Sequence, residues 1–249
     1  ADQQLDIPQT ALQSYNQLAW PIGGAVGYIS NNSFDYNFGK ADHTISYWMS
    51  LASASTSERF FVTAGESLDN LAIRMTSASR LKLHAELGGT ATGYEYITDS
   101  GSEMEVGKWY HIVEVWDYSG SDWNTVTCYI NGEAQTPLDI SAVEDEDADY
   151  NQHVKIGWYA GTDNLQGGLT EISFWNAGLT QSQINELYND GKALDADSHS
   201  LRDNLVHYWR NDGLTLWQDR KGTEHMTNNY FTETILQQAG VDASRDCQG

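Results

Sequence analysis

The feature that most constrains the fold is a series of short runs of β-branched and aromatic residues, each separated from the next by turn-forming residues. The run Thr44–Met49 places Ile45, Tyr47 and Met49 on one face and its even-numbered residues on the other. Alternation with a period of two is typical of strands that bury one face. Further runs of this habit are 59–64, 71–76, 80–87, 109–116, 124–130, 153–158 and 168–175. The sequence therefore predicts an all-β fold, a sandwich or barrel of antiparallel strands.

Two local signals refine this prediction. Asn131 and Gly132 directly follow one of the runs and predict a tight hairpin. Thr180 and Gln183 have the spacing of a capping box, which marks the start of a helix, and Gly191 supplies its end. The apolar stripe between them consists of Ile184, Leu187 and Tyr188. We expect one short helix that covers the core as a lid.

The chain divides into three parts on this basis. Residues 1–24 are expected to form an N-terminal arm, residues 25–191 the sandwich, and residues 192–249 a C-terminal extension that packs on the sandwich or on neighbours. The extension is too short and polar for a core of its own. Weaker helical patterns occur at 8–17 and 230–239, and a strand pattern occurs at 205–209.

The charge balance excludes some classes of function. The chain of 249 residues carries 35 Asp and Glu against 13 Lys and Arg, a net charge of −22. Such an excess of acids repels phosphate, so we expect no nucleic-acid partner and no attraction to anionic membranes. Charged residues make up only 19% of the chain and hydrophobic ones 40%, which is typical of a packed domain. No run approaches the roughly 20 apolar residues of a membrane span, so no membrane insertion is expected.

Cysteine usage leaves the compartment open. Cys128 lies in a strand pattern and is expected to be buried, whereas Cys247 is close to the end, and two cysteines do not make a disulfide scaffold. We expect no bridge between them. No signal-peptide pattern is present, and Ala1 fits both a chain that has lost its initiator Met and one released from a signal peptide.

Several motifs occur in a fixed order between residues 25 and 190. They are HTISYW (43–48), GKWYHIV (107–113), CYING (128–132), KIG (155–157) and GLTEISFW (168–175), the last followed by LTQSQINELY (179–188). As an ordered set they resemble laminin-G-like jelly-roll domains of the concanavalin A-like lectin/glucanase superfamily. The resemblance implies a two-sheet antiparallel jelly roll with a short C-terminal lid helix. Residues 204–213, with Asp219 and Thr223, resemble the segment that opens or links such domains in phage and environmental bacterial surface proteins.

The chain departs from the family pattern at a few positions. His43 stands where Phe is usual, and Thr170 and Glu171 stand where the last strand often has two acids. Glucanases on this fold place their acids in a fixed register on one strand, and a retaining mechanism needs two carboxylates about 5–5.5 Å apart. The acidic run 144–149 has neither that register nor apolar anchors, and Glu103 and Glu105 flank Met104 in a turn. We therefore expect no enzyme; a glycoside hydrolase using Glu144 or Glu146 is the least favoured hypothesis.

Calcium is the one cofactor that the resemblance suggests. The acids at alternate positions of 145–149 have the opening spacing of a calcium loop, but Tyr150 and Ile156 stand where an EF-hand needs Gly and Glu. In the superfamily, calcium sits on the rim or concave face of the sandwich. The candidate ligands by this analogy are Asp35, Asp163 and Asn164.

Carbohydrate binding requires exposed aromatic rings flanked by amides and acids, because sugars present both CH faces and hydroxyls. The candidate residues are Trp123, Trp158, Tyr159, Tyr94 and Tyr96, which lie in predicted loops or alternate with acids. The tryptophans of the predicted strands are expected in the core. These are Trp48, Trp109, Trp116 and Trp175.

Two classes of function remain. The first is a structural or adhesive surface protein, such as a capsid decoration or fibre protein on a phage virion, with other subunits or copies of itself as partners. The alternative is a secreted bacterial lectin-like protein with glycans as partners. Acidity and the terminal arms favour the first hypothesis, and the aromatic loops favour the second.

Overall fold

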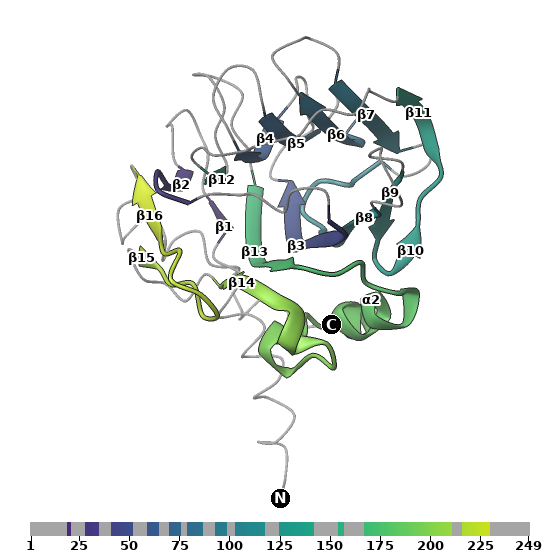
Figure 1. Cartoon of the computed structure of the whole chain (residues 1–249). Helices are drawn as coiled ribbons and strands as arrows, with labels where there is room; N and C mark the ends of the chain where they lie inside the picture. The colour runs from purple at the N-terminus through teal and green to yellow at the C-terminus, as the bar shows by residue number, and fades with distance from the viewer. Residues whose placement is uncertain are drawn as a thin grey trace, which may run out of the picture.

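The computed structural model describes residues 19–20, 28–34, 41–51, 59–64, 70–75, 79–86, 93–98, 103–117, 125–141, 154–156, 167–210 and 216–229. Within them the chain folds into two antiparallel sheets packed face to face, with one α-helix outside (Figure 1). The all-β jelly-roll prediction is confirmed. The arrangement of short alternating strands agrees with the period of two in the sequence.

The seven-stranded sheet is centred on β13, β3 and β8. Its strand order is β1 (Ala19–Trp20), β13 (Gly167–Trp175), β3 (His43–Leu51), β8 (Trp109–Asp117), β9 (Thr125–Ile130) and β10 (Glu133–Ala134), and β14 (Leu205–Trp209) also pairs with β13.

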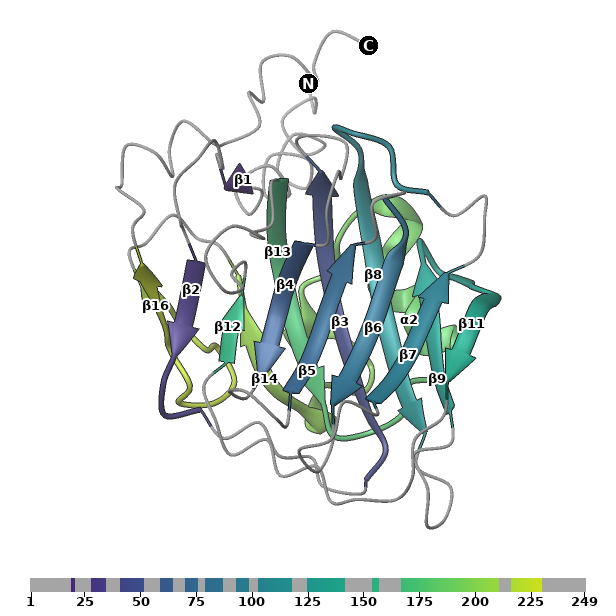
Figure 2. The same ribbon diagram turned by 90° about the horizontal axis from the view of Figure 1, so that it is seen from above.

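The nine-stranded sheet forms the opposite layer. Its order is β11 (Pro137–Ser141), β7 (Gly93–Thr98), β6 (Leu81–Glu86), β5 (Asn70–Met75), β4 (Arg59–Ala64), β12 (Val154–Ile156), β2 (Tyr28–Asn31), β16 (Met226–Asn229) and β15 (Leu216–Trp217). Figure 2 shows strands β4 to β7 in front of β3 and β8, with α2 on the far side.

The main core lies between the two sheets. Tyr47, Met49, Ile112 and Phe174 point into it from the seven-stranded sheet and are fully buried, with Trp209 of β14 among them. Burying large apolar side chains of this kind contributes about 1.5–3 kcal/mol each. Residues of the same strands that alternate with these face the other way, toward α2.

A second apolar cluster lies on that outer face, under helix α2 (Gln181–Tyr188). Ile184 and Leu187 of the helix pack with Trp175 of β13 and Tyr208 of β14, all of them buried. The predicted lid helix is therefore present. At its start the Gln183 side chain accepts hydrogen bonds from the Thr180 backbone N–H (2.8 Å) and hydroxyl (2.9 Å).

Short turns continue the chain beyond the helix. They are the 3₁₀ turns η1 (Asn189–Gly191), η2 (Ala196–Ser198) and η3 (Arg202–Asn204). Asn189, Asp190 and Gly191 all have positive φ, at 47°, 53° and 83°. Two L-residues in succession in the left-handed region are uncommon, since each costs about 1–2 kcal/mol unless its surroundings hold it there.

The Asn131–Gly132 pair forms the predicted hairpin between β9 and β10. Both residues have positive φ (53° and 82°), as a type I′ turn requires. The Asn131 side-chain oxygen accepts a hydrogen bond from the His111 backbone N–H at 2.9 Å. The turn is thereby fastened to the neighbouring strand β8.

The described residues of the C-terminal segment, 205–210 and 216–229, contribute strands to both sheets. β14 extends the seven-stranded sheet beside β13, and β16 extends the nine-stranded sheet beside β2. The weak helical patterns at 8–17 and 230–239 lie outside the described residues. No helix of the described part is long and apolar enough to cross a membrane.

Candidate functional site

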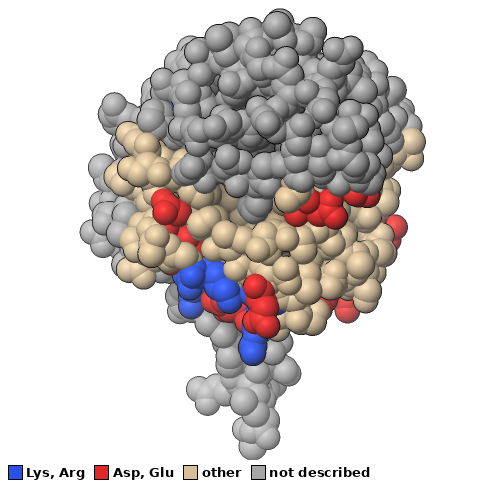
Figure 3. Space-filling view, in the orientation of Figure 1, with Lys and Arg blue, Asp and Glu red and all other residues tan. Residues whose placement is uncertain are grey.

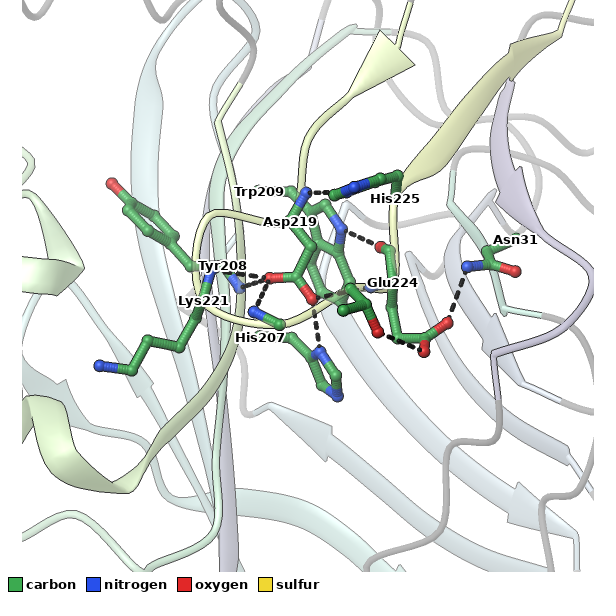
Figure 4. Close-up of polar contacts among 10 residues, drawn as sticks. Asn31, His207, Tyr208, Trp209, Asp219, Lys221, Glu224 and His225 are labelled. Atoms are coloured by element: carbon green, nitrogen blue, oxygen red, sulfur yellow. Dashed lines mark hydrogen bonds and ion pairs between the residues drawn. The ribbon is translucent and has the colours of Figure 1, made fainter.

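Asp219 is the centre of a polar cluster that holds the C-terminal segment in place (Figure 4). Its side chain is completely shielded from solvent and accepts five hydrogen bonds. The donors are His207 Nδ1 (2.7 Å) and the backbone N–H groups of Tyr208 (3.1 Å), Lys221 (3.1 Å), Gly222 (3.0 Å) and Glu224 (3.2 Å). These bonds close the turn that connects β15 to β16 and tie it to β14.

Further contacts extend this cluster to β2. The Trp209 indole N–H donates to the Glu224 carbonyl oxygen at 2.7 Å, and the Asn31 amide donates to the Glu224 carboxylate at 2.9 Å. His225 Nδ1 accepts from the Asp219 backbone N–H at 3.1 Å. Figure 4 shows these groups converging on the Asp219–Glu224 turn from β14, from β2 and from the turn itself.

The electrostatics of Asp219 indicate a structural anchor. Burial alone would raise its pKa, but the hydrogen bonds from His207 and from the backbone of Gly222, Tyr208 and Lys221 outweigh burial and lower the pKa. All five neighbours of the carboxylate are N–H donors, so the anion is already satisfied. A cation site would need additional oxygen ligands beside it.

Glu171 forms a second buried network on the outer face of the seven-stranded sheet. It lies in the irregularity of β13 between Thr170 and Ser173, with φ at 51°. Its carboxylate accepts hydrogen bonds from the Tyr208 hydroxyl and from Arg210 Nε (2.8 Å), and Arg210 Nη1 also contacts Asp195 Oδ2 at 2.8 Å. Burial raises the pKa of Glu171 to about 7, although Arg210 and Tyr208 oppose the rise.

Charges of both signs lie next to each other on this side of the molecule. Figure 3 shows basic and acidic side chains next to each other in the lower centre of this face, and further acidic side chains apart from them, at the left and right below the grey region. The Arg210–Asp195 pair is one such contact.

Glu114 is a third buried carboxylate, and it lies inside the main core. Its side chain accepts a hydrogen bond from the Tyr47 hydroxyl at 2.7 Å, directly across from Cys128 of β9. Burial raises the pKa of Glu114 to about 8, partly offset by hydrogen bonds from Tyr47 and Trp116. Glu114 is therefore protonated at neutral pH.

These three carboxylates do not form a catalytic pair. Glu114 faces the core between the sheets, Glu171 is held by Tyr208 and Arg210, and Asp219 is saturated by N–H donors. Glu103 and Glu105 are exposed, with Met104 buried between them, and Glu105 pairs with Lys108. Among the residues that the structure describes, no group of three metal-ligating side chains occurs.

A fourth arrangement crosses the outer face of the seven-stranded sheet. Thr170 of β13, Trp48 of β3 and His111 of β8 lie side by side in register, and we call them the Trp48 row. They are 2%, 6% and 1% exposed. His111 Nε2 lies 2.9 Å from the Ser46 hydroxyl, whereas His111 Nδ1 and Thr170 Oγ1 have no hydrogen-bond partner.

Aromatic stacking covers one end of the Trp48 row. The Tyr188 ring, at the end of α2, stacks on Trp48 (5.9 Å between centroids, 19°) and on His111 (6.1 Å, 12°). Burial lowers the pKa of His111 to about 3, so its ring is neutral. The row thus combines a neutral imidazole, a hydroxyl and an indole, all three shielded from solvent.

Most residues predicted to bind ligands lie outside the described part of the chain. These are Trp123, Trp158, Tyr159, Asp35, Asp163 and Asn164. The acidic run 144–149, for which no catalytic register and no EF-hand is predicted, also lies outside it. The backbone of Tyr94 and Tyr96 lies in β7, opposite Ala85 and Leu83 of β6. The sugar and calcium contacts of all these residues stay predictions.

Sequence reasoning missed the buried polar groups. Trp48, Trp116 and Trp175 are buried as predicted, and Trp109 is half-buried. Nothing in the sequence distinguishes Glu114 from other polar positions of alternating strands, whereas His111 belongs to the family motif at 107–113, which gives no sign that its ring is buried. The segment containing Asp219 and Thr223 did carry a signal, because it resembles a family segment.

The sandwich, the outer lid helix and the strand register together define a lectin-like jelly roll. The family model described as concanavalin A-like lectin/glucanases superfamily matches residues 23–185. The chain therefore belongs to the laminin-G-like branch of this superfamily, as the sequence motifs indicated.

Solved structures share this fold at low sequence identity. A candidate carbohydrate-binding protein from Bacteroides ovatus ATCC 8483 aligns with a TM-score of 0.57 and 18% identity, covering 83% of this chain and 59% of that chain. The receptor binding domain of botulinum neurotoxin D aligns with a TM-score of 0.51 and 14% identity, covering 70% of this chain and 43% of that chain. The chain thus spans less than two thirds of either protein. No curated protein sequence matches it.

Proposed function

We propose that the protein is a lectin-like carbohydrate-binding protein that acts outside the cell and without catalysis. The observation that carries this proposal is the match of residues 23–185 to the lectin/glucanase superfamily on a complete jelly-roll frame. The structural similarity to a candidate carbohydrate-binding protein of Bacteroides ovatus supports the same class. Fold similarity gives the class of site and not its ligand.

The lectin hypothesis is favoured over the virion hypothesis. The family match and the structural similarity to the Bacteroides ovatus protein concern sugar-binding folds, and neither points to a capsid or a fibre. Acidity and terminal arms, which favoured the virion hypothesis, are equally compatible with a secreted lectin. Partner subunits remain compatible with this function, as many lectins gain avidity from multiple sites.

We propose that the protein is not catalytic because of where the described carboxylates lie. A retaining glycosidase needs two carboxyl groups about 5–5.5 Å apart that both reach the substrate. Glu171, whose raised pKa would suit an acid, is buried and bonded to Tyr208 and Arg210. The described acids therefore offer no such pair.

A glycan array tests the proposal. The protein is applied with and without calcium to neutral and acidic saccharides, alongside Trp123→Ala and an assay for release of reducing ends. Binding of a defined glycan class without sugar release is expected. Binding that requires calcium would support Asp35, Asp163 and Asn164 as ligands. Absence of binding to every saccharide, or steady hydrolysis of a bound one, would refute the proposed function.

A further inference from the structure

The Trp48 row contains two buried polar atoms that the folded chain leaves without hydrogen bonds. Thr170 Oγ1 and His111 Nδ1 lie on opposite sides of Trp48 in the register of β13, β3 and β8. A buried polar group without a partner destabilises the folded state, because it has lost its hydrogen bonds to water and gained none in return. More than nine in ten such groups in folded proteins are satisfied, so two on either side of one indole call for an explanation.

The spacing of the strands that carry these two residues suits a small polyhydroxy ligand. Neighbouring strands are about 4.8 Å apart, so positions on β13 and β8 are separated by about 10 Å. Two hydrogen bonds of about 2.8 Å leave about 4 Å between the ligand oxygens, a separation available to hydroxyls of one pyranose ring. The indole between them offers an apolar plane for the CH face of the same ring.

The present occupant of that plane is Tyr188. Its ring stacks on both Trp48 and His111, and it is the last residue of α2. Directly after it, Asn189 and Asp190 adopt left-handed backbone conformations. Strain of this kind is tolerated where surrounding contacts enforce it, and it makes an alternative position of the helix end less costly.

The hairpin residue Gly132 lies beside amide groups of α2 and beside Tyr188. Gln181 donates to the Gly132 carbonyl oxygen at 2.6 Å and to Asn185 Oδ1 at 2.9 Å. A methyl group at Gly132 would lie 3.1 Å from Asn185 Oδ1 and 3.3 Å from Tyr188 Cδ1. The hairpin and the helix end thus border the Trp48 row with further hydrogen-bonding groups.

We infer that the Trp48 row is a subsite for one pyranose ring, covered in the free protein by Tyr188. The sugar stacks on Trp48, and its hydroxyls bond to His111 Nδ1 and Thr170 Oγ1 while Tyr188 moves aside. This inference rests on the proposed carbohydrate-binding function and assigns it a site that the loop candidates do not include.

Thr170→Val is the sharpest test, because valine keeps the volume of threonine and removes only the unpartnered hydroxyl. The best-binding glycan of the array is titrated against wild type, Thr170→Val and Tyr188→Ala, and the melting temperature of each variant is measured. We expect Thr170→Val to bind about tenfold more weakly, the loss of one hydrogen bond, with an unchanged or higher melting temperature. Tyr188→Ala is expected to bind several-fold more tightly because the cover is gone.

The matched control is Thr44→Val on the same face of β3. The Thr44 hydroxyl donates to the Ala177 carbonyl oxygen (2.8 Å) and accepts from the Leu179 N–H (3.0 Å), so its loss lowers the melting temperature without changing glycan affinity. If wild type binds a glycan and Thr170→Val binds it equally well, the inferred subsite at the Trp48 row is refuted, whereas the proposed carbohydrate-binding function is not. Weaker glycan binding by Tyr188→Ala than by wild type would contradict the inference that Tyr188 covers the subsite. If neither wild type nor Tyr188→Ala binds any glycan, the proposed function itself fails.

Discussion

The Tyr47 hydroxyl donates a 2.7 Å hydrogen bond to the Glu114 carboxyl group inside the main core. A buried acid with a pKa of about 8 stays protonated in the folded chain at pH values where the unfolded chain has lost that proton. Folding is therefore linked to proton uptake by this one residue.

Glu114→Gln should remove that linkage. Between pH 5 and pH 7.5 the native state of the wild type holds a proton that the unfolded chain lacks, so this group lowers the free energy of unfolding by about 1.4 kcal/mol for each pH unit of increase. Glutamine keeps an acceptor for Tyr47 and does not titrate. Urea unfolding at pH 5, 6 and 7 should show that the free energy of unfolding of the variant increases relative to that of the wild type as pH rises. Glu105→Gln, at an exposed position, is the control, and parallel pH profiles for Glu114→Gln and wild type would contradict the expectation.

Asp219→Asn should weaken the anchor of the C-terminal segment. The amide replaces one accepting oxygen by a donor that faces N–H groups, and we expect a loss of about 2–4 kcal/mol at pH 7. Because the folded pKa of Asp219 is lowered, its stabilising contribution is present above the unfolded pKa and is lost as pH falls through the folded value. The difference between variant and wild type in thermal unfolding should therefore shrink at acidic pH. Asp203→Asn, exposed in η3, should behave as wild type, and equal losses at both positions would argue against the anchor.

Arg210→Leu should be more damaging alone than together with Glu171→Gln. At pH 8, above its pKa of about 7, Glu171 is ionised, and removing the guanidinium leaves this buried carboxylate without its charged partner, which typically costs about 3–5 kcal/mol. The double variant has no carboxylate at position 171 that would be left unpaired, so it should be more stable than Arg210→Leu alone. A double-mutant cycle from denaturant unfolding should give a coupling of about 1–3 kcal/mol. Additive losses would show that the two residues act independently.

Gly132→Ala and Gly107→Ala form a matched pair. Both glycines have positive φ (82° and 80°), so both substitutions incur the same backbone cost of about 1 kcal/mol. Only at Gly132 does the new methyl group meet side chains of α2, whereas at Gly107 nothing lies within 4 Å. The additional loss of stability at Gly132 therefore measures the contact between hairpin and helix. Equal melting temperatures for the two variants would mean that the side chains of α2 move to accommodate the methyl group without loss of stability.

Much of the frame could be predicted from sequence alone. The alternation of Ile45, Tyr47 and Met49 places them in the core, and the Asn131–Gly132 pair specifies its turn because few other residues adopt two successive positive φ angles. The short strands β2, β11 and β16 were not predicted. Their pairing depends on partners far away in the chain, which local patterns do not encode.

The polar interior could not be predicted. His111 and Glu114 alternate with apolar neighbours as residues of β8 do in general, and only the three-dimensional register shows that Glu114 faces Tyr47 and His111 faces Trp48. The bulge that turns Glu171 toward Tyr208 likewise depends on β14, more than 30 residues later. Which residues share a buried environment is a tertiary property, and sequence patterns indicate only which face each residue occupies.

The pairing of β14 with β13 and of β16 with β2 also sets the order in which the protein can be completed during synthesis. β2 lies near residue 30, and its partner β16 ends at residue 229. Since translation releases the chain from its N-terminus, one edge of the nine-stranded sheet stays unpaired until almost all of this sequence has left the ribosome. Until then the nascent sandwich exposes β2 as an open edge, the kind of surface that pairs with other chains. The turn around Asp219 precedes β16 in the chain, so the contacts that hold this turn also hold the strand that covers the β2 edge.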